Sequence, residues 1–466
     1  MKTLRSGLVA MLYLTVQSTH ALTINEYIEQ AKQKNPLLKS YQESAEAARL
    51  KIISSEIDLA PVLTGSYTTS EDKSRPSQLG TKRESEIYTL GLAKKFQTGT
   101  TVKIDAQTAN FDNKGAPPGF SQYSTGAVGV TLQQSLWKDF FGHGTRLKVS
   151  RQQKLAELEQ LSAELQSRAA LYDLESSFWD YAVAKEDLKL KQANLDRAKK
   201  IERWTSNRVS NGISDRADLM NAKALLALRE AQLISAEEEL KGQEVKFRDN
   251  LQLGESDATP VIDVNLTQAR PYLIDLMKQK NIQKIEARIA SLESEAKGLV
   301  AEETVDSLRP DLSVFGNYTT TSYEFNREDA VSNMTKDDYP KNTIGVNFTW
   351  VFDTSAKNSV RDASKKEALA AKLKAQKKSS EGQYAWTDLV RKYEVLKKSV
   401  STLENVAQFQ RERAKAEQNK LSQGRTVTAN VVTAETDAAE AEINLLKTKS
   451  SLRKLEASSL FFVDVE

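Results

Sequence analysis

The stretches VSNGISDRADL at residues 209–219 and LSQGRTVTANV at residues 421–431 share one plan and decide the fold. In each, a small polar residue and a second polar residue precede a glycine, Gly212 or Gly424, and interrupt a long charged helical pattern. Helices commonly end on a left-handed residue, which glycine adopts without steric cost. We therefore predict a sharp turn between two helices at both places. The turns are 424 − 212 = 212 residues apart, which suggests that the chain repeats one plan twice.

The composition indicates long helices rather than ordinary globular domains. Of 466 residues, 28% are charged and only 7% aromatic, and the mean hydropathy is −0.52. Ala, Leu, Lys, Glu and Gln dominate long tracts, as is typical of long helices and coiled coils. The nine prolines leave two long gaps, one from Pro118 to Pro260 and one after Pro340. Because proline costs about 3 kcal/mol inside a helix, we expect both gaps to be helical.

Two helices of unusual length are expected next to the glycine turns. Helical periodicity runs from about residue 145 to about Val209, and again from about Lys357 to about Leu421. Each stretch covers about 65 residues, or about 97 Å at 1.5 Å per residue. The first carries two apolar stripes, one through Trp179 and one through Phe178. Two stripes favour a helix with a neighbour on each side, as in a tube of helices, although a helix in a soluble bundle also has a wide stripe.

Strands are expected in two regions, where small or polar residues alternate with apolar ones. Leu90 and Leu92 alternate with Gly91 and Ala93 in the first half of the chain, and the same period of two recurs around residues 102–107, 128–132 and 344–350. A period of two is typical of strands with two different faces. QTGT at residues 97–100 is expected to be a short hairpin turn. The spacing Tyr67–Trp137 exceeds Tyr318–Trp350 by 38 residues, so we predict four strands in the first half and two in the second.

Matching segments support an internal two-fold repeat. IDLAP at residues 57–61 resembles DSLRP at 306–310, and GSYTT at 65–69 resembles GNYTT at 316–320. We predict a first structural repeat over residues 22–253, a linker over 254–270 and a second repeat over 271–466, in which one helix runs from the linker to about residue 308.

The N-terminus is expected to be a cleaved secretory signal over residues 1–21. Lys2 and Arg5 precede an apolar run at residues 7–16, and Thr19 and Ala21 fit a small-residue cleavage site. The alternative is a membrane anchor, but the run is short for a bilayer. Removal of the signal leaves 66 − 2 = 64 basic against 63 acidic residues, a balance that gives no reason to expect a nucleic-acid partner.

The residues that usually carry catalysis or bind metals are scarce. The chain has no cysteine, which excludes disulfides, thiol catalysis and cysteine metal sites. His143 is the one histidine after the signal, and its setting GHG favours a turn residue over a ligand. We find no phosphate-binding loop, no H-E-x-x-H and no G-x-S-x-G. We therefore expect no enzyme activity, no metal and no cofactor.

Taken in order, these features resemble the TolC-type outer-membrane channel proteins of Gram-negative bacteria. The resemblance rests on LTINEYIEQAKQKNP at residues 22–36, the helix-to-strand exits at Pro61 and Pro310, the strand-to-helix exits after Trp137 and Trp350, and the paired glycine turns. It implies a mostly α fold with a β-barrel portion. Long coiled-coil hairpins would form an α-barrel, and three chains, each giving four to six transmembrane strands, would close a barrel of 12 to 18 strands.

The resemblance also implies a function and partners. The homotrimer would lie in the outer-membrane lipid with a long periplasmic extension. It would serve as the exit duct for efflux or type I secretion, together with an inner-membrane transporter and a periplasmic adaptor protein.

Aromatic residues cluster where the strands pass into helices. In the barrel reading they form a girdle at the inner membrane interface, and the alternative is packing at the junction itself. The candidates are Trp137, Phe140, Phe141, Trp350 and Phe352.

The resemblance places the two glycine turns at the periplasmic aperture. The candidates for adaptor contact are Arg208, Ser210 and Gly212 with their equivalents Lys420, Ser422 and Gly424. The aperture candidates are Asp215, Asp218, Arg425 and Asn430. The family has an aspartate ring past the second turn, where this chain has Asn430 and Thr433.

A specific role is expected for Arg425. We expect it to pair with Asp215 or Asp218 of a neighbouring hairpin and to hold the tip shut. The alternative is that these charges only cap helix ends, since an aspartate near a helix N-terminus is favourable by about 0.3–1 kcal/mol.

A second class of protein shares the long helical hairpins. A soluble periplasmic adaptor or scaffold would bury its strands in small globular domains, with one face polar. The glycine- and threonine-rich strands and the two long connecting loops of the first half favour the channel.

Overall fold

The computed structural model describes residues 21–73, 81–264, 266, 271–336 and 338–464, which fall into two compact units. The sheet unit consists of Glu43–Glu164 and Ile285–Gly382, and the hairpin unit consists of Met1–Gln42, Leu165–Lys284 and Gln383–Glu466. Each unit thus draws on both halves of the chain. The predicted signal segment lies outside the described residues except for Ala21.

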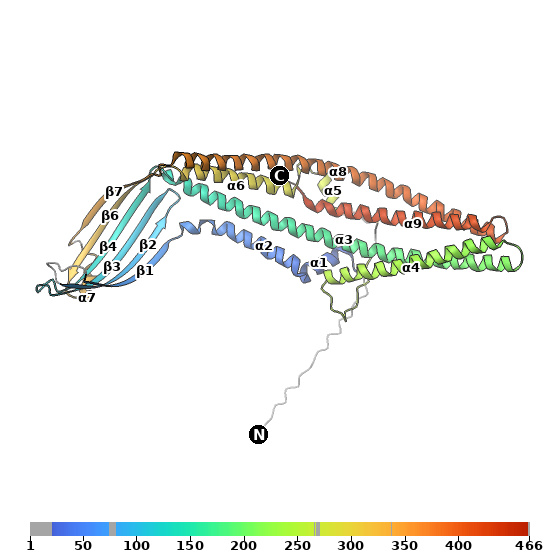
Figure 1. Cartoon of the computed structure of the whole chain (residues 1–466), viewed down its shortest axis with the longest axis horizontal. Coiled ribbons are helices and arrows are strands. Elements are labelled where there is room, and N and C mark those ends of the chain that lie inside the picture. The colour runs from blue at the N-terminus through green and yellow to red at the C-terminus, as the bar shows by residue number, and fades with distance from the viewer. Residues whose placement is uncertain (1–20, 74–80, 265, 267–270, 337, 465–466) are drawn as a thin grey trace, which may run out of the picture. The chain divides into compact units, whose positions relative to one another are not determined.

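A six-stranded antiparallel sheet dominates the sheet unit (Figure 1). The predicted four strands of the first half and two of the second are all present, and the turn expected at residues 97–100 joins β2 to β3, with φ of 72° at Gly99. In spatial order the strands are β1 (Val62–Asp72), β2 (Lys82–Lys95), β3 (Thr100–Lys114), β4 (Gln122–Ser135), β6 (Asp311–Glu324) and β7 (Lys341–Thr349).

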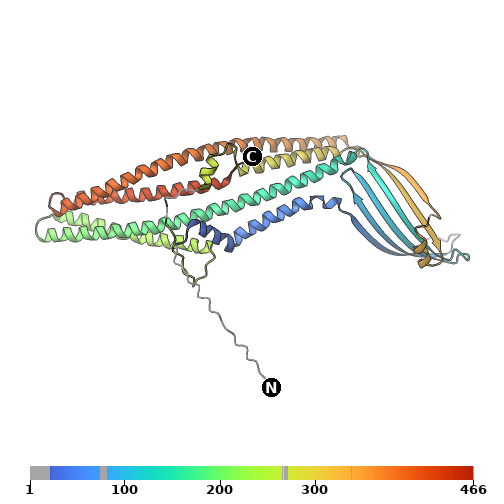
Figure 2. The same cartoon turned by 180° about the vertical axis from the view of Figure 1, so that it is seen from behind.

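Four helical segments of the sheet unit lie side by side in the order α2–α3–α6–α8 (Figures 1 and 2). They are most of α2 (Pro36–Ile53), the first part of α3 (His143–Ser210), α6 (Ile285–Ser307) and the first part of α8 (Thr354–Ser422). Ion pairs join neighbours in this order, namely Lys51–Glu159 at 2.5 Å, Arg151–Glu303 at 2.6 Å and Lys374–Glu293 at 3.2 Å. The order of the helices therefore follows that of the strands to which they connect.

The hairpin unit is built around an aromatic core and two helix hairpins. Its further elements are α1 (Ile24–Lys34), α4 (Arg216–Asn250), α5 (Pro271–Met277), α9 (Thr428–Ala457) and a two-stranded sheet of β5 (Ile282–Lys284) and β8 (Phe462–Asp464). The fully buried Tyr27 ring stacks on Phe247, with ring centres 4.9 Å apart, and lies 5.3 Å from Phe178. These contacts fix α1 against α3 and α4.

The long helices agree with the sequence, and some shorter ones do not. α3 has 68 residues and α8 has 69, close to the expected 65. The single helix expected from the linker to about residue 308 is wrong, because α5, β5 and α6 divide this segment. Ile282 is buried with Leu273 and Phe462, and β5 pairs its backbone with β8, a contact that helical periodicity does not reveal. The return helices are about half as long as α3 and α8, with 35 residues in α4 and 30 in α9.

Candidate functional sites: an apolar sheet face and two hairpin turns

The strand register gathers the apolar residues of all six strands on one face of the sheet, here called the apolar face. One row across it reads Leu63–Leu92–Ile104–Val130–Tyr318, each residue paired with the next. The large apolar side chains exposed on this face are Leu63, Leu90, Leu92, Ile104, Val130, Leu132, Ile344, Val346 and Phe348. Water-soluble proteins rarely expose so contiguous an apolar patch, so it marks an interaction or membrane surface.

The opposite face of the sheet is polar. Here Gln133 donates to Ser313 Oγ at 3.1 Å, and Asn317 donates to Thr131 Oγ1 at 2.9 Å. Each strand places at least one threonine, serine, asparagine or glutamine on this face, and β3 adds Lys103 and Asp105, although β2 also places Ile87 and Ala93 here. Strands with one lipid-compatible and one polar side are typical of membrane barrels.

The length of the apolar face along its strands can be compared with a membrane barrel. Along β6 the face extends from Leu312 to the row of Ser322, Gly126, Thr108 and Tyr88, which is 322 − 312 = 10 residue steps. Ten steps span about 33 Å along a strand. With the strand tilt of about 40° that is typical of membrane barrels, this length corresponds to about 25 Å, the height of their apolar band.

The part of the apolar face between the rows of Leu312 and Ser322 is here called the apolar band, and exposed aromatic residues lie at both of its borders. At the border next to the helices, the predicted residues Trp137, Phe140, Phe141, Trp350 and Phe352 are all exposed, and they form the ring pairs Phe140–Phe141 and Trp350–Phe352. At the opposite border Tyr67 and Tyr88 pair across β1 and β2, with ring centres 4.7 Å apart. The tyrosine pair was missed from the sequence, because its place in the band depends on the register of four strands. A girdle role for the five predicted aromatics stays a prediction.

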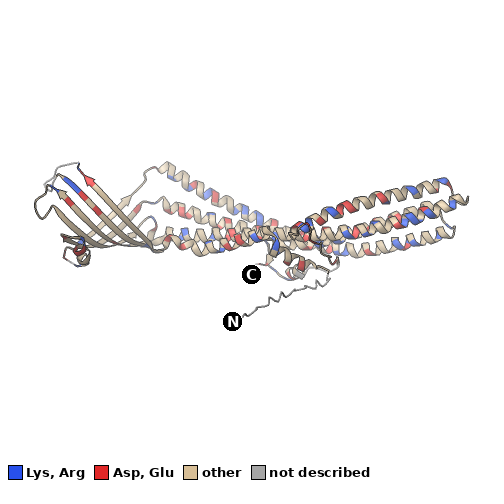
Figure 3. Cartoon of the chain, turned by 90° about the horizontal axis from the view of Figure 1, so that it is seen from below, with Lys and Arg blue, Asp and Glu red and all other residues tan. Residues whose placement is uncertain are grey.

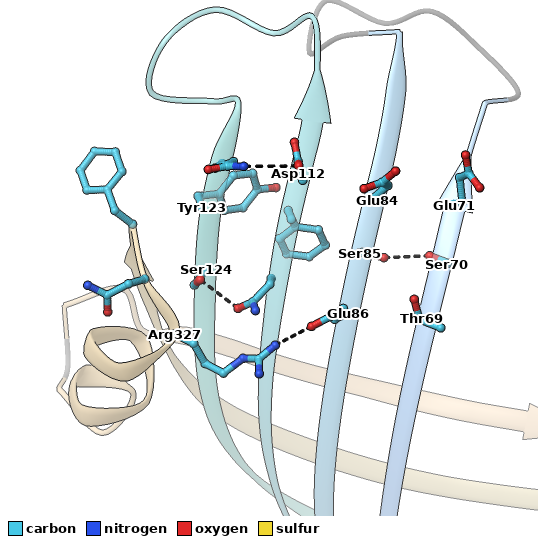
Figure 4. Close-up of a pocket in the computed structure, with 15 residues that line it drawn as sticks. Thr69, Ser70, Glu71, Glu84, Ser85, Glu86, Asp112, Tyr123, Ser124 and Arg327 are labelled. Carbon is cyan, nitrogen blue, oxygen red and sulfur yellow. Dashed lines mark hydrogen bonds and ion pairs between the residues drawn. The ribbon is translucent and has the colours of Figure 1, made fainter.

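Beyond the tyrosine row, the same face becomes charged (Figure 4). Four acidic residues there are matched by four basic ones. Their ion pairs are Lys73–Glu71, Lys82–Glu71, Lys82–Glu84, Lys114–Asp112 and Arg327–Glu86. These residues are here called the charged collar. Its four acidic residues and Arg327 border a hollow of about 760 Å³ next to the short helix α7 (Arg327–Asn333).

The two predicted glycine turns are confirmed and have the same geometry. Gly212 has φ of 73° and Gly424 has φ of 74°. In the first turn Gly212 N–H donates to Val209 O at 3.0 Å and Ile213 N–H donates to Arg208 O at 2.8 Å. The second turn repeats both bonds at the same distances, between the residues 212 positions further on. This is the Schellman pattern of a helix C-terminus, in which glycine takes the left-handed position.

The residues predicted for adaptor contact divide into two kinds. Ser210 donates to Asn207 O and Ser422 donates to Asn419 O, so each hydroxyl caps its own helix. Arg208 instead reaches the other hairpin, where its Nη1 donates to Leu421 O at 3.3 Å. Lys420 forms an ion pair with Glu417 at 2.7 Å.

The predicted aperture residues do not pair with one another within the chain. Arg425 donates to Gln423 Oε1 at 3.3 Å, and no ion pair joins it to Asp215 or Asp218 among the residues described. Asp215 is the N-cap residue of α4, and Asp218 accepts a hydrogen bond from Ser214 at 2.6 Å. Asn430 donates to Thr426 Oγ1 at 3.1 Å. A pairing of Arg425 with a neighbouring chain stays a prediction.

A buried charge cluster joins the two hairpins, and no pattern in the sequence predicted it. Glu435 of α9 is only 4% exposed. It accepts hydrogen bonds from Arg197 of α3 and Arg411 of α8, both at 3.1 Å, and from Gln418 at 2.6 Å. Arg411 also pairs with Glu442 at 2.8 Å. Charged residues of both signs occur along the whole length of these helices (Figure 3). The sequence alone therefore does not distinguish the four that come together, which are Arg197, Arg411, Glu435 and Glu442.

Two further findings concern ions and spans. Within the described part of the chain, no three His, Asp or Glu side chains are arranged to hold a metal ion. No helix among these residues is both long enough and apolar enough to cross a bilayer.

The fold is that of outer-membrane channel proteins. The outer-membrane channel OprN is 17% identical with a TM-score of 0.66, over 94% of this chain and 89% of that one. VceC of Vibrio cholerae is 15% identical with a TM-score of 0.66, over 93% and 94%. The open MtrE channel of Neisseria gonorrhoeae is 14% identical with a TM-score of 0.64, over 94% and 88%.

Residues 27–250 match the model of the outer membrane efflux protein family. The match covers 250 − 27 + 1 = 224 of the 466 residues. Over these residues the chain is similar to that family, and the solved structures that share its fold are channels rather than enzymes. A sequence search of curated proteins found no match.

Proposed function

We propose that the chain is one protomer of a trimeric outer-membrane duct of a Gram-negative bacterium, through which efflux or secretion substrates leave the cell. The observation that carries this proposal is the apolar face, about 25 Å high by the strand spacing and tilt, opposite a polar face in the same sheet. A sheet of this kind suits a wall between lipid and water. The family match supports the efflux role.

The open edges of the sheet unit support assembly with further copies. β1 and β7 are the two edge strands, and an unpaired strand edge is not tolerated in lipid, where every backbone polar group needs a partner. Pairing β1 of one copy with β7 of the next would satisfy both edges. Three copies would close a barrel of 3 × 6 = 18 strands.

The helices of the same unit have matching open edges. α2 and the turn that follows it expose Leu50, Ile53 and Ile57. At the other edge, α8 exposes Val360, Leu369 and Leu373. Contact between these two apolar stripes in neighbouring copies would remove both from water. The same head-to-tail contact would thus continue from the strands into the helices and build the α-barrel.

The hairpin turns are proposed as the periplasmic aperture and the docking point of an adaptor protein, which would connect the duct to an inner-membrane transporter. The candidates remain Arg208, Ser210 and Gly212 with Lys420, Ser422 and Gly424. The repeat boundaries 22–253, 254–270 and 271–466 belong to the same proposal, since both halves follow the order helix, strands, long helix, turn, return helix. The alternative of a soluble adaptor gains little support, because the six strands form one sheet with an exposed apolar face.

Cysteine cross-linking tests the assembly directly, because the chain has no cysteine of its own. Tyr67→Cys on β1 is combined in one chain with single cysteines along β7, and outer membranes are oxidised and analysed by denaturing electrophoresis. We expect covalent dimers and trimers from a few neighbouring β7 positions and no larger species. Tyr67→Cys combined with Ile104→Cys, in the middle of the sheet, is the control and should give monomer. Monomers from every β7 position, or an open ladder, would contradict the trimer.

A further inference from the structure

The short helix α7, between β6 and β7, packs on the apolar face of the sheet. Ser322 and Thr320 have their side chains on this face, in the same alternation as Tyr318. Ser322 Oγ donates to Ala330 O and Thr320 Oγ1 donates to Met334 O, both at 2.6 Å. Two serine and threonine hydroxyls of β6 therefore satisfy carbonyl groups at the end of the helix and hold it on this side.

The contact is close enough to depend on one glycine. A Cβ atom on Gly126 would lie 2.1 Å from Ala330 O and 2.9 Å from Met334 Cβ. Ala330 itself is fully buried. The backbone of the helix thus rests on the backbone of β4, and any larger residue at position 126 would push the helix away from the sheet.

The helix lies at the border of the apolar band. Gly126 and Ser322 belong to the row that also contains Thr108 and Tyr88. From the first turn of α7, Arg327 reaches β2, where its guanidinium lies 4.5 Å from the centre of the Tyr88 ring and pairs with Glu86 at 2.8 Å (Figure 4). Arg327 therefore links the helix to the last apolar row and to the first charged row at once.

The charged collar above this border is satisfied within the protein. Each acidic residue of the collar pairs with a basic one, and Ser124 donates to Asn110 at 2.9 Å. From Tyr88 to Glu86, two residues along β2, the surface changes from apolar side chains to charges that pair with one another. Such a change is expected where a barrel passes from the lipid tails to the lipid headgroups.

Two apolar side chains next to this step are left uncovered. Phe325, which borders the hollow together with Arg327, is 81% exposed. Val331 of α7 is also exposed. On the lipid side of a membrane wall such side chains would be covered by lipid, because removing apolar surface from water is favourable.

We propose that α7 is an interfacial helix, which lies outside the barrel wall at the headgroup level of the outer leaflet and inserts Phe325 into the lipid. This proposal rests on the proposed function, because it takes the apolar face as the lipid face. The occupant of the surface is outer-leaflet lipid, since α7 packs on the last row of the apolar face through Gly126 and Ser322. The exposed Glu328, Asp329 and Ser332 of α7 would then lie among the headgroups. The helix would then fix the depth of the barrel in the membrane from the outer side.

Site-specific fluorescence tests this placement. Single cysteines at Phe325, Leu90 and Thr125 are labelled with an environment-sensitive dye in the full chain, which is then reconstituted into phospholipid vesicles. Leu90 lies on the apolar face one row inside the Tyr88 border, and Thr125 is adjacent to Gly126 on the polar face. For Phe325→Cys we expect blue-shifted emission and quenching by lipids that carry a nitroxide near the headgroup. For Thr125→Cys we expect quenching by a water-soluble quencher instead.

The Leu90→Cys label separates the two proposals. If it is quenched by lipid nitroxides while the Phe325→Cys label responds only to the water-soluble quencher, the barrel stands and the interfacial helix is wrong. If the Leu90→Cys label is itself in water, the membrane assignment fails first.

A second variant tests whether the contact between Gly126 and α7 holds the helix on the sheet. Gly126→Val should shift the Phe325→Cys label toward water, with loss of its lipid quenching. Gly316→Val is the matched control, because Gly316 lies on the same face and a Cβ there meets nothing within 4 Å. Equal lipid quenching in both variants would show that Gly126 does not seat α7.

Discussion

Arg197 of α3 and Glu435 of α9 are joined by an ion pair of 3.1 Å, although they are 238 residues apart in the chain. The pair connects the first helix hairpin to the second. Because the Glu435 carboxylate is buried and also accepts bonds from Arg411 and Gln418, it acts as the common acceptor between the two hairpins.

Replacing Glu435 should loosen this connection. In Glu435→Gln the guanidinium groups of Arg197 and Arg411 keep Glu442 as their one remaining counter-charge, at 3.7 Å and 2.8 Å. A buried charge left without any partner typically costs about 3–5 kcal/mol. Because Glu442 remains, we expect a smaller loss, of up to about 3 kcal/mol in the free energy of unfolding, measured by denaturant in detergent.

The control for Glu435→Gln is Asp437→Asn, which removes the exposed pair between Arg413 and Asp437. An exposed pair is worth at most about 1 kcal/mol. Equal losses in the free energy of unfolding for the two variants would show that the buried cluster contributes no more to stability than an exposed ion pair.

Replacing the glycine of a turn by alanine should lower the free energy of unfolding, and the loss should come from the backbone conformation alone. A Cβ at Gly212 would meet nothing within 4 Å, so Gly212→Ala meets no steric obstacle outside its own backbone. The left-handed conformation costs an alanine about 1–2 kcal/mol, and we expect a loss of this size in thermal or denaturant unfolding. Gly242→Ala in the middle of α4, which also meets open space, should instead stabilise by up to about 1 kcal/mol. The same sign for both would contradict the turn geometry.

The two faces of the sheet should respond differently to charge. Ile104 lies on the apolar face and Gln107 on the polar one. Arginine in the middle of a lipid-facing strand costs about 2–4 kcal/mol, so Ile104→Arg should lower the folded fraction after refolding into vesicles. Gln107→Arg should refold like the unchanged protein. The reverse order would mean that the face assignment is inverted.

The stability of the hairpin unit should depend on pH through Lys191. Burial lowers the pKa of Lys191, while Asp187 opposes the shift and Arg229 and Lys447 add to it. A lysine whose pKa is lower in the folded state than in the unfolded state reduces the free energy of unfolding. The reduction is complete at pH values below the folded-state pKa, and it disappears as the pH rises toward the unfolded-state pKa of about 10.4. Lys191→Met should therefore raise the free energy of unfolding at pH 7, with a smaller gain at pH 10.5.

The exposed Lys189 offers the control for this variant. Lys189→Met should change the free energy of unfolding little at either pH. An equal gain for both variants, or a gain for Lys191→Met that grows with pH, would rule out the burial penalty.

The predicted latch at the turns can be tested through Arg425. If Arg425 binds Asp215 or Asp218 of a neighbouring chain, Arg425→Ala should raise the single-channel conductance in planar bilayers. Lys415→Ala on α8, the helix that precedes the turn, is a control that removes one positive charge away from the turn. Unchanged conductance in Arg425→Ala would leave only the helix-capping role for the two aspartates.

The sequence predicted those features that local residues determine. Gly212 and Gly424 identify their turns because a left-handed position needs glycine, and alternation of Val128, Val130 and Leu132 identifies a strand without its neighbours. It could not predict that Gly126 lies under α7, because this contact joins β4 to a helix about 200 residues later. The β5–β8 pairing and the Glu435 cluster were missed for the same reason, since both need partners that only the folded chain brings together.

Single-channel recording of the purified protein in planar lipid bilayers tests the central claim most directly. A membrane duct of three copies predicts detergent-dependent purification from outer membranes and discrete, uniform conductance steps. A protein that purifies without detergent and gives no conductance would contradict the duct, and the apolar face would then need a different partner.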